Sequence, residues 1–140
     1  MTKETRSDTW EPNTWVLVVD DDEDILEAIE TVLSRHGFRA VVTSNAQTAL
    51  QILRKSPPPA ALLVDLRMPF MTGSELVRAI RNRPTLSDMR IIGLSGDVEG
   101  KMAAEELALD EYLCKPVDVG QLVAAVRRAL APADGEQARP

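Results

Sequence analysis

The sequence predicts a single α/β domain, in which a five-stranded parallel sheet carries helices on both faces. Short apolar runs that read as strands alternate along the chain with segments whose apolar residues recur at helical spacing. The apolar runs are nearly continuous, as expected for parallel strands that are covered on both sides. A chain of 140 residues is long enough for one core but too short for a second domain of ordinary size.

Five apolar runs are the expected strands, and helices fill the intervals between them. The strand runs are 15–19, 39–43, 60–65, 91–94 and 112–114. After the first run, apolar residues recur at helical spacing from Ile25 to Leu33, and Gly37 is the expected stop of that helix. Asn45 can cap the second helix, and the three prolines at 57–59 forbid its continuation.

Three more helices are expected in the second half of the chain. Gly73 and Ser74 open the third, which closes before Pro84. The fourth, 98–109, is the weakest because its apolar face is mostly Met and Ala. Asp118 caps the last. The inner face of this last helix carries Leu122, Val123, Val126, Ala129 and Leu130.

Composition and the chain ends limit the possible functions. Residues 1–13 and 132–140 are polar, contain Pro or Gly and are expected to be flexible, which leaves 14–131 as the domain. With 16 basic and 22 acidic residues the formal charge is −6, so no direct contact with nucleic acid or membrane is expected. No stretch resembles a signal peptide or a membrane span, which favours a cytoplasmic protein. Cys114 lies in an apolar run and is expected to be a buried structural thiol.

Polar side chains stand at the ends of four expected strands. The acidic run Asp20-Asp21-Asp22 follows the first strand, Asp65 ends the third, Ser95 follows the fourth and Lys115 follows the fifth. Because the carboxyl ends of parallel strands meet at one edge of a sheet, we expect these groups to converge there.

The converging groups suit phosphoryl transfer. Carboxylates brought together would repel one another unless a cation neutralised them, and a set of oxygen ligands favours Mg²⁺ over Zn²⁺. Lys115 adds positive charge and Ser95 adds a hydrogen-bond donor, so phosphoryl oxygens could be aligned and neutralised. Asp65 would be the nucleophile and would form an acyl phosphate. Asp22 is better explained as the cap of the following helix.

Taken together, these motifs resemble the receiver domains of two-component response regulators, from about Trp15 to Leu130. The resemblance implies the CheY-like, flavodoxin-like strand order 2-1-3-4-5. It also implies roles for individual residues. These are metal binding by Asp20, Asp21, Asp65 and the main-chain carbonyl of Arg67; phosphorylation at Asp65, with Gly73 eight residues on; a switch made by Ser95 and Tyr112; and a phosphate-binding Lys115 whose bond to Pro116 is usually cis.

The resemblance further implies how the protein works. A histidine kinase or phosphotransfer protein would phosphorylate Asp65, and a downstream protein would read the phosphorylated form. The chain would be a single-domain receiver, because only about ten residues follow Leu130. It would catalyse its own phosphorylation and dephosphorylation but act on no external metabolite, so it is not expected to be an enzyme in the usual sense. Arg67 and Asp97, two positions after Asp65 and Ser95, would border the path of the attacking water and set the lifetime of the phosphorylated state.

Two alternatives remain open at this point. Leu107–Asp110 stands where a Gly commonly ends the fourth helix in the family, and a left-handed cap without Gly is strained. A short or irregular fourth helix motivates a phosphorylation-independent adaptor of the same fold. The other alternative is a flavodoxin-like or aspartate-nucleophile phosphatase enzyme. Against it, no Asp stands two residues after Asp65, and no phosphate-binding loop for a flavin follows the first strand.

Overall fold

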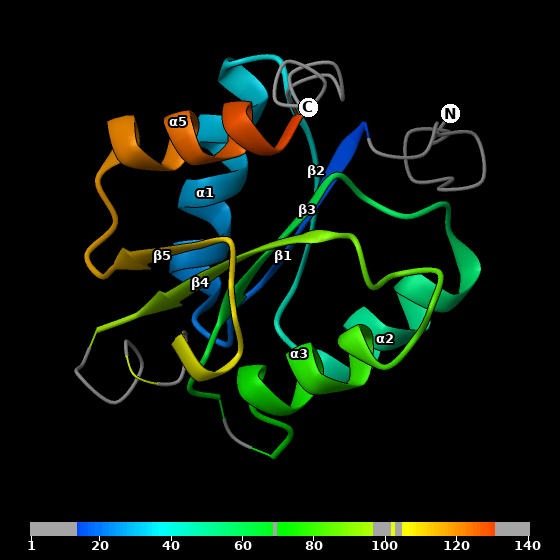
Figure 1. Cartoon of the computed structure of the whole chain (residues 1–140). Coiled ribbons are helices and arrows are strands. Elements are labelled where there is room, and N and C mark those ends of the chain that lie inside the picture. The colour runs from blue at the N-terminus through cyan, green and yellow to red at the C-terminus, as the bar shows by residue number, and fades with distance from the viewer. Residues whose placement is uncertain (1–13, 69, 97–101, 103–104, 131–140) are drawn as a thin grey trace, which may run out of the picture.

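The computed structural model describes residues 14–68, 70–96, 102 and 105–130 (Figure 1). In chain order the elements are β1 (Trp15–Val19), α1 (Glu23–Arg35), β2 (Arg39–Thr43), α2 (Ala46–Lys55), β3 (Ala61–Asp65), α3 (Gly73–Arg81), β4 (Arg90–Ser95), β5 (Glu111–Cys114) and α5 (Val119–Leu130). The strands form one parallel sheet in the order β2-β1-β3-β4-β5, with α1 and α5 on one face and α2 and α3 on the other. The predicted fold class and strand order are confirmed.

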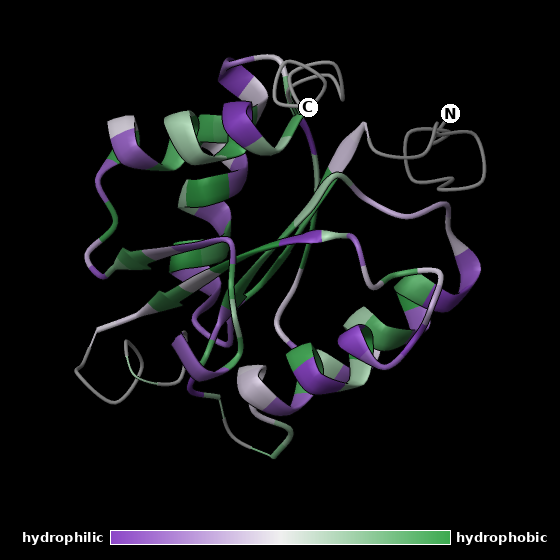
Figure 2. Ribbon diagram, viewed as in Figure 1, coloured by the Kyte–Doolittle hydropathy of each residue, from purple (hydrophilic) through white to green (hydrophobic). Residues whose placement is uncertain are grey.

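The strands divide the core into two clusters, because successive strand residues point to opposite faces of the sheet. The α2/α3 cluster joins residues such as Leu17, Leu62 and Ile91 to the apolar faces of α2 and α3. The α1/α5 cluster joins the intervening residues, such as Val18 and Leu63, to α1 and α5. Figure 2 shows this pattern as largely hydrophobic strands between helices in which hydrophobic and hydrophilic residues alternate.

Side-chain caps fix where the helices begin. Asp22 Oδ1 accepts hydrogen bonds from the first-turn N–H groups of α1, Asn45 caps α2, and Asp118 Oδ2 accepts the Gln121 N–H at the start of α5, all as predicted. Thr72 caps α3 in a reciprocal capping box with Glu75. The same box closes the loop that follows β3.

The prediction for Cys114 is wrong, because its side chain is exposed. β5 lies at an edge of the sheet, and Leu113 is its only buried residue. An apolar run at an edge strand does not guarantee burial, since fewer neighbours cover it than cover a central strand.

The fourth predicted helix, 98–109, is described only in part. Met102, Glu105 and Glu106 are helical, whereas residues 98–101 and 103–104 lie outside the described part of the chain. At its end Ala108 has φ +55°, the left-handed conformation that a glycine would adopt without strain. The fourth helix therefore ends in a left-handed residue that is not glycine, which is the strained ending that the sequence predicted. The segments 1–13 and 132–140, expected to be flexible, also lie outside the described residues.

A polar clasp follows Ala108 and fixes the start of β5. The Asp110 N–H donates to the Ile91 carbonyl at 2.9 Å, and Asp110 Oδ2 accepts the Ile91 N–H at 2.7 Å. Arg81, at the end of α3, pairs with the same carboxylate at 3.5 Å and donates to the Met89 carbonyl at 2.8 Å.

None of the helices among the described residues has the length and apolar character needed to cross a membrane.

Candidate functional site

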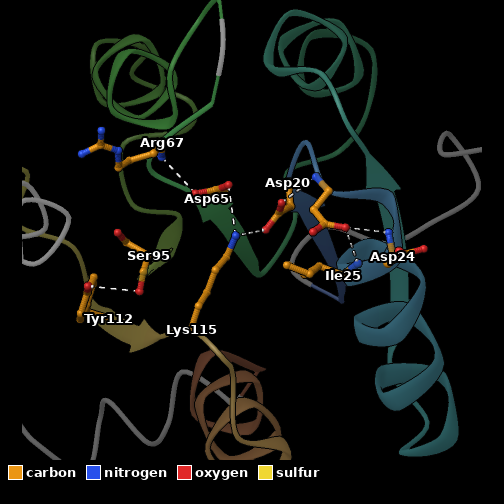
Figure 3. Close-up of polar contacts among 9 residues, drawn as sticks. Asp20, Asp24, Ile25, Asp65, Arg67, Ser95, Tyr112 and Lys115 are labelled. Carbon is orange, nitrogen blue, oxygen red and sulfur yellow. Dashed lines mark hydrogen bonds and ion pairs between the residues drawn. The ribbon is translucent and has the colours of Figure 1, made fainter. Parts of the chain in front are cut away.

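Asp20, Asp65 and Lys115 meet at the carboxyl edge of the sheet (Figure 3). Asp20 follows β1, Asp65 ends β3 and Lys115 follows β5. Each lies two residues after a strand residue of the α1/α5 cluster, namely Val18, Leu63 and Leu113. Because side chains two apart along a strand share a face, the alternation that builds the core also brings these three charges together.

Lys115 bridges the two carboxylates. Its Nζ lies 2.8 Å from Asp20 Oδ2 and 3.2 Å from Asp65 Oδ2. The other oxygen of each carboxylate accepts a main-chain hydrogen bond from two residues ahead: Asp22 N–H to Asp20 Oδ1 at 2.9 Å, and Arg67 N–H to Asp65 Oδ1 at 3.0 Å. Both carboxylates are buried. They are therefore held in fixed orientations with one oxygen each directed at the ammonium.

The charges at the site are shifted by burial and by one another. Burial raises the pKa of Asp65 to about 6, and the nearby Asp20 adds to the rise, while the Arg67 N–H and the Lys115 charge oppose it. Burial works to lower the pKa of Lys115, but the Asp20 and Asp65 carboxylates outweigh it and the net direction is upward. Lys115 is thus firmly cationic, whereas Asp65 carries its negative charge at an energetic cost.

Asp21 completes an acidic cluster. Carboxylate oxygens of Asp20, Asp21 and Asp65 lie within 4.8 Å of one another, and Asp21 is exposed at the surface. Asp20 Oδ2 is buried and receives no hydrogen bond of good geometry; the Lys115 ammonium is its neighbour. A hard divalent cation fits such a site, because it would supply the remaining charge to oxygens that are already close together. The predicted trio of acidic ligands is brought together.

Ser95 and Tyr112 form a second pair beside this centre. Ser95 ends β4 with a buried side chain, and the Tyr112 hydroxyl donates to the Ser95 carbonyl at 3.4 Å. The same carbonyl accepts the Lys115 N–H at 2.9 Å. Tyr112 packs against the α2/α3 cluster. The predicted switch residues therefore adjoin each other, and Ser95 joins them to Lys115.

Other predictions have mixed outcomes. The Lys115–Pro116 bond is cis, as the resemblance implied. The Arg67 N–H binds Asp65, but its carbonyl as a metal ligand stays a prediction. Asp97 lies outside the described residues, so its pairing with Arg67 also stays a prediction. His36 ends α1 with Nδ1 2.9 Å from the Val32 carbonyl, a local contact at the helix terminus.

Gly73 has a structural role that the sequence motif did not reveal. A Cβ at this position would lie 2.0 Å from the Asp65 carbonyl oxygen and 2.8 Å from the Leu66 Cα. Only glycine lets the start of α3 come this close to the end of β3. The loop between β3 and α3, residues 66–72, is here called the β3–α3 loop. It begins next to Asp65, and its far end is held against the Asp65 carbonyl by Gly73.

Known proteins resemble this chain in sequence and in fold. A family model for the response regulator receiver domain matches residues 16–127. The transcriptional regulatory protein PrrA of Mycobacterium tuberculosis is 33% identical over 115 residues, which are 82% of this chain and 49% of that protein. GltR of Pseudomonas aeruginosa, also a transcriptional regulatory protein, is 36% identical over 126 residues, 89% of this chain and 52% of that protein. The chain thus spans about half the length of these curated relatives.

Solved structures agree with the sequence comparison. The crystal structure of a response regulator receiver protein from Pseudomonas putida superposes with a TM-score of 0.76 at 33% sequence identity. The match covers 85% of this chain and 98% of that one. The likeness in fold therefore covers most of the chain, in agreement with the family model.

Proposed function

We propose, since this chain belongs to the family of response regulator receiver domains, that Asp65 accepts a phosphoryl group from a phosphohistidine of a histidine kinase or phosphotransfer protein. The observation that carries the proposal is the placement of the Asp65 carboxylate. It is buried at a strand end, 3.2 Å from the Lys115 ammonium and within the acidic cluster of Asp20 and Asp21. The carboxylate proposed as the nucleophile thereby lies beside a cation and an acidic cluster that could hold a metal ion.

The chemistry follows from these neighbours. A carboxylate oxygen of Asp65 forms a bond to phosphorus while the bond from phosphorus to the donor imidazole breaks; the imidazole nitrogen keeps that electron pair and takes a proton from solvent. Asp20, Asp21, Asp65 and the Arg67 carbonyl would hold Mg²⁺, which when bound supplies charge that offsets the phosphoryl oxygens. Lys115, already held at the site by two carboxylates, turns toward a phosphoryl oxygen. The chain modifies only itself and acts on no external metabolite.

The output would be a change in protein contacts. A phosphoryl group at Asp65 attracts the Ser95 hydroxyl, and movement of Ser95 disturbs the Tyr112 hydrogen bond to its carbonyl. A downstream protein that prefers the resulting arrangement shifts the equilibrium toward it. The single-domain organisation stays a prediction, because the matched relatives are about twice as long.

The test of this function is the intact mass of the protein after incubation with acetyl phosphate and Mg²⁺. We expect a gain of one phosphoryl group in the wild type and in Asp88→Asn, a control that alters an exposed aspartate in the turn before β4. Asp65→Asn, or chelation of Mg²⁺, should abolish the gain. A gain that survives in Asp65→Asn would contradict the assignment.

The strained end of the fourth helix at Ala108 supports one other candidate, a phosphorylation-independent adaptor. The Asp65→Asn variant distinguishes this adaptor from a phosphorylated receiver. If Asp65→Asn keeps both the partner and the cellular role of the wild type, the adaptor is favoured, because a receiver needs the carboxylate whereas an adaptor does not. Loss of partner binding in that variant, with folding intact, favours the receiver.

Arg67 should set the lifetime of the phosphorylated state together with Asp97. The Arg67 main chain is bound to Asp65 and its side chain is exposed. In the family, the positions two residues after the phosphoacceptor and two after the switch residue border the path of the attacking water. We expect Arg67→Ala and Asp97→Ala to change the half-life of the phosphorylated protein severalfold. Arg78→Ala, on the exposed side of α3, is the control. Decay is followed by intact mass after removal of the donor, and half-lives equal to that of the wild type would disprove the role.

A further inference from the structure

Phe70 is exposed in a conformation that costs the fold free energy. Its side chain is 97% exposed, and its backbone has φ +66°. A positive φ is a genuine outlier for a bulky residue, because Cβ then approaches the following carbonyl. An aromatic ring in water also forgoes the burial that stabilises other large apolar residues. Neither feature contributes to packing within the described residues.

The β3–α3 loop that carries Phe70 is firmly anchored. Leu66 and Met68 are buried in the α2/α3 cluster, and Met71 packs against it. The Thr72–Glu75 capping box closes the far end. Phe70 is therefore presented by a loop in which Leu66, Met68 and Met71 pack inward, which is preorganisation rather than chance exposure of a loose segment.

The loop that carries Phe70 also begins and ends at Asp65. The loop starts at Asp65, and Gly73 brings its end back against the Asp65 carbonyl. Phe70 thus lies in a short loop, both ends of which contact the proposed phosphoacceptor. Asp65 itself is only 4% exposed, so a donor group has to reach in past the surrounding rim. Figure 3 shows the Arg67 side chain of this loop directed away from Asp65.

We propose that Phe70 is the apolar anchor by which the phosphohistidine-bearing protein docks on this chain. The proposal rests on the proposed function, because it assigns a partner to the same site. A histidine carried by a protein reaches the recessed Asp65 only if its flanking surface lies against the rim, where Phe70 is the fully exposed aromatic among the described residues. The fitting partner carries an apolar patch beside its phosphohistidine. Burial of an aromatic anchor at the centre of an interface gives the binding energy that the free chain forgoes.

Small donors make the inference testable, because acetyl phosphate can reach Asp65 without covering Phe70. Phe70→Asn removes the ring but keeps a residue that tolerates positive φ, so the loop should hold its shape. Phe70→Trp keeps an aromatic anchor. Val119→Ala is the matched control, since it trims another exposed apolar side chain, at 51% exposure, outside the loop.

The experiment compares two donors. Each variant is phosphorylated in two separate reactions, one with acetyl phosphate and Mg²⁺ and one with a purified phosphorylated donor protein. The donor protein is the one that phosphorylates the wild type fastest among all histidine kinases and phosphotransfer proteins of the source organism. We expect Phe70→Asn to lose about tenfold or more in kcat/KM with the protein donor, mainly through KM. Its rate with acetyl phosphate should stay within about twofold. Phe70→Trp should restore transfer, and Val119→Ala should resemble the wild type in both reactions.

The outcomes separate the inference from the proposed function. If acetyl phosphate fails to modify Asp65 in the wild type, the proposed function itself falls. If the wild type is modified by both donors but Phe70→Asn keeps full transfer from the protein, only the docking role falls. An equal loss with both donors would also overturn it, because the loop would then act on Asp65 directly. A complete donor set in which no protein phosphorylates the wild type overturns it as well.

Discussion

Gly73→Ala is expected to lower the free energy of unfolding by about 3 kcal/mol, a large effect for one methyl group. The added Cβ would lie 2.0 Å from the Asp65 carbonyl oxygen and 2.8 Å from the Asp65 carbonyl carbon, and both are backbone atoms that cannot rotate away. The start of α3 would have to shift, which would strain the capping box and the β3–α3 loop. Urea unfolding followed by circular dichroism measures the loss.

Gly96→Ala is the matched control for this prediction. Gly96 also lies beside the site, but among the described residues a Cβ there would meet only the Lys115 Cβ at 3.8 Å, an ordinary contact. Its substitution should change the free energy of unfolding by less than about 0.5 kcal/mol. Equal stability of the two variants would show that the approach of Gly73 to Asp65 is not tight in solution.

Asp65→Asn is expected to stabilise the metal-free protein at neutral pH by about 2 kcal/mol, although it removes the proposed phosphoacceptor. The raised pKa of Asp65, about 6 against an ordinary 3.8, means that the folded state ionises this carboxyl less readily than the unfolded state does. A rise of that size corresponds to about 3 kcal/mol. That rise is already net of the opposing Lys115 attraction, and the cost of burying the Asn amide offsets part of it.

The pH dependence gives this prediction its sign. Below about pH 4 the carboxyl is protonated in both states, so the two proteins should differ little through this group. As the pH rises from about 4 through 6, the free energy of unfolding of the wild type falls because its folded state has to ionise Asp65 at a cost. The Asn variant has no such group and does not lose stability in this way. The difference in free energy of unfolding, measured in EDTA between pH 4 and 8, should therefore grow with pH and then level off. A difference that is constant with pH, or that favours the wild type at pH 8, would contradict it.

Magnesium should reverse this advantage. A cation that binds Asp20, Asp21 and Asp65 stabilises only a folded protein that carries the site. Adding Mg²⁺ at pH 8 should therefore raise the melting temperature of the wild type more than that of Asp65→Asn. The comparison also tests the metal site independently of phosphorylation.

Strong local signals explain why most of the fold could be predicted. The run 15–19 and the run 39–43 coincide with β1 and β2, because continuous apolar segments are bounded there by polar residues. Asp22 could be separated from Asp20 and Asp21 because only its side chain stands at the N-cap position of α1. Asp65 and Lys115 were predictable as neighbours because parallel strands place their carboxyl ends together.

The features that the sequence did not predict depend on tertiary contacts. Cys114 looked buried, but the place of β5 at the sheet edge leaves it exposed. Asp110 gave no signal for its clasp with Ile91 and Arg81, which are far away along the chain. Phe70 read as one more apolar residue between two methionines. Its exposure depends on the path of the β3–α3 loop, which no local pattern shows.

The division of the core by the sheet has a consequence for how mutations combine. The α1/α5 cluster and the α2/α3 cluster are separated by the strand backbones. Substitutions such as Leu33→Ala and Ile80→Ala, one in each cluster, should show little epistasis, whereas pairs within one cluster should not simply add. Substitutions in one helical layer can therefore accumulate independently of those in the other layer. The residues at the carboxyl edge of the sheet, in contrast, are constrained by both layers.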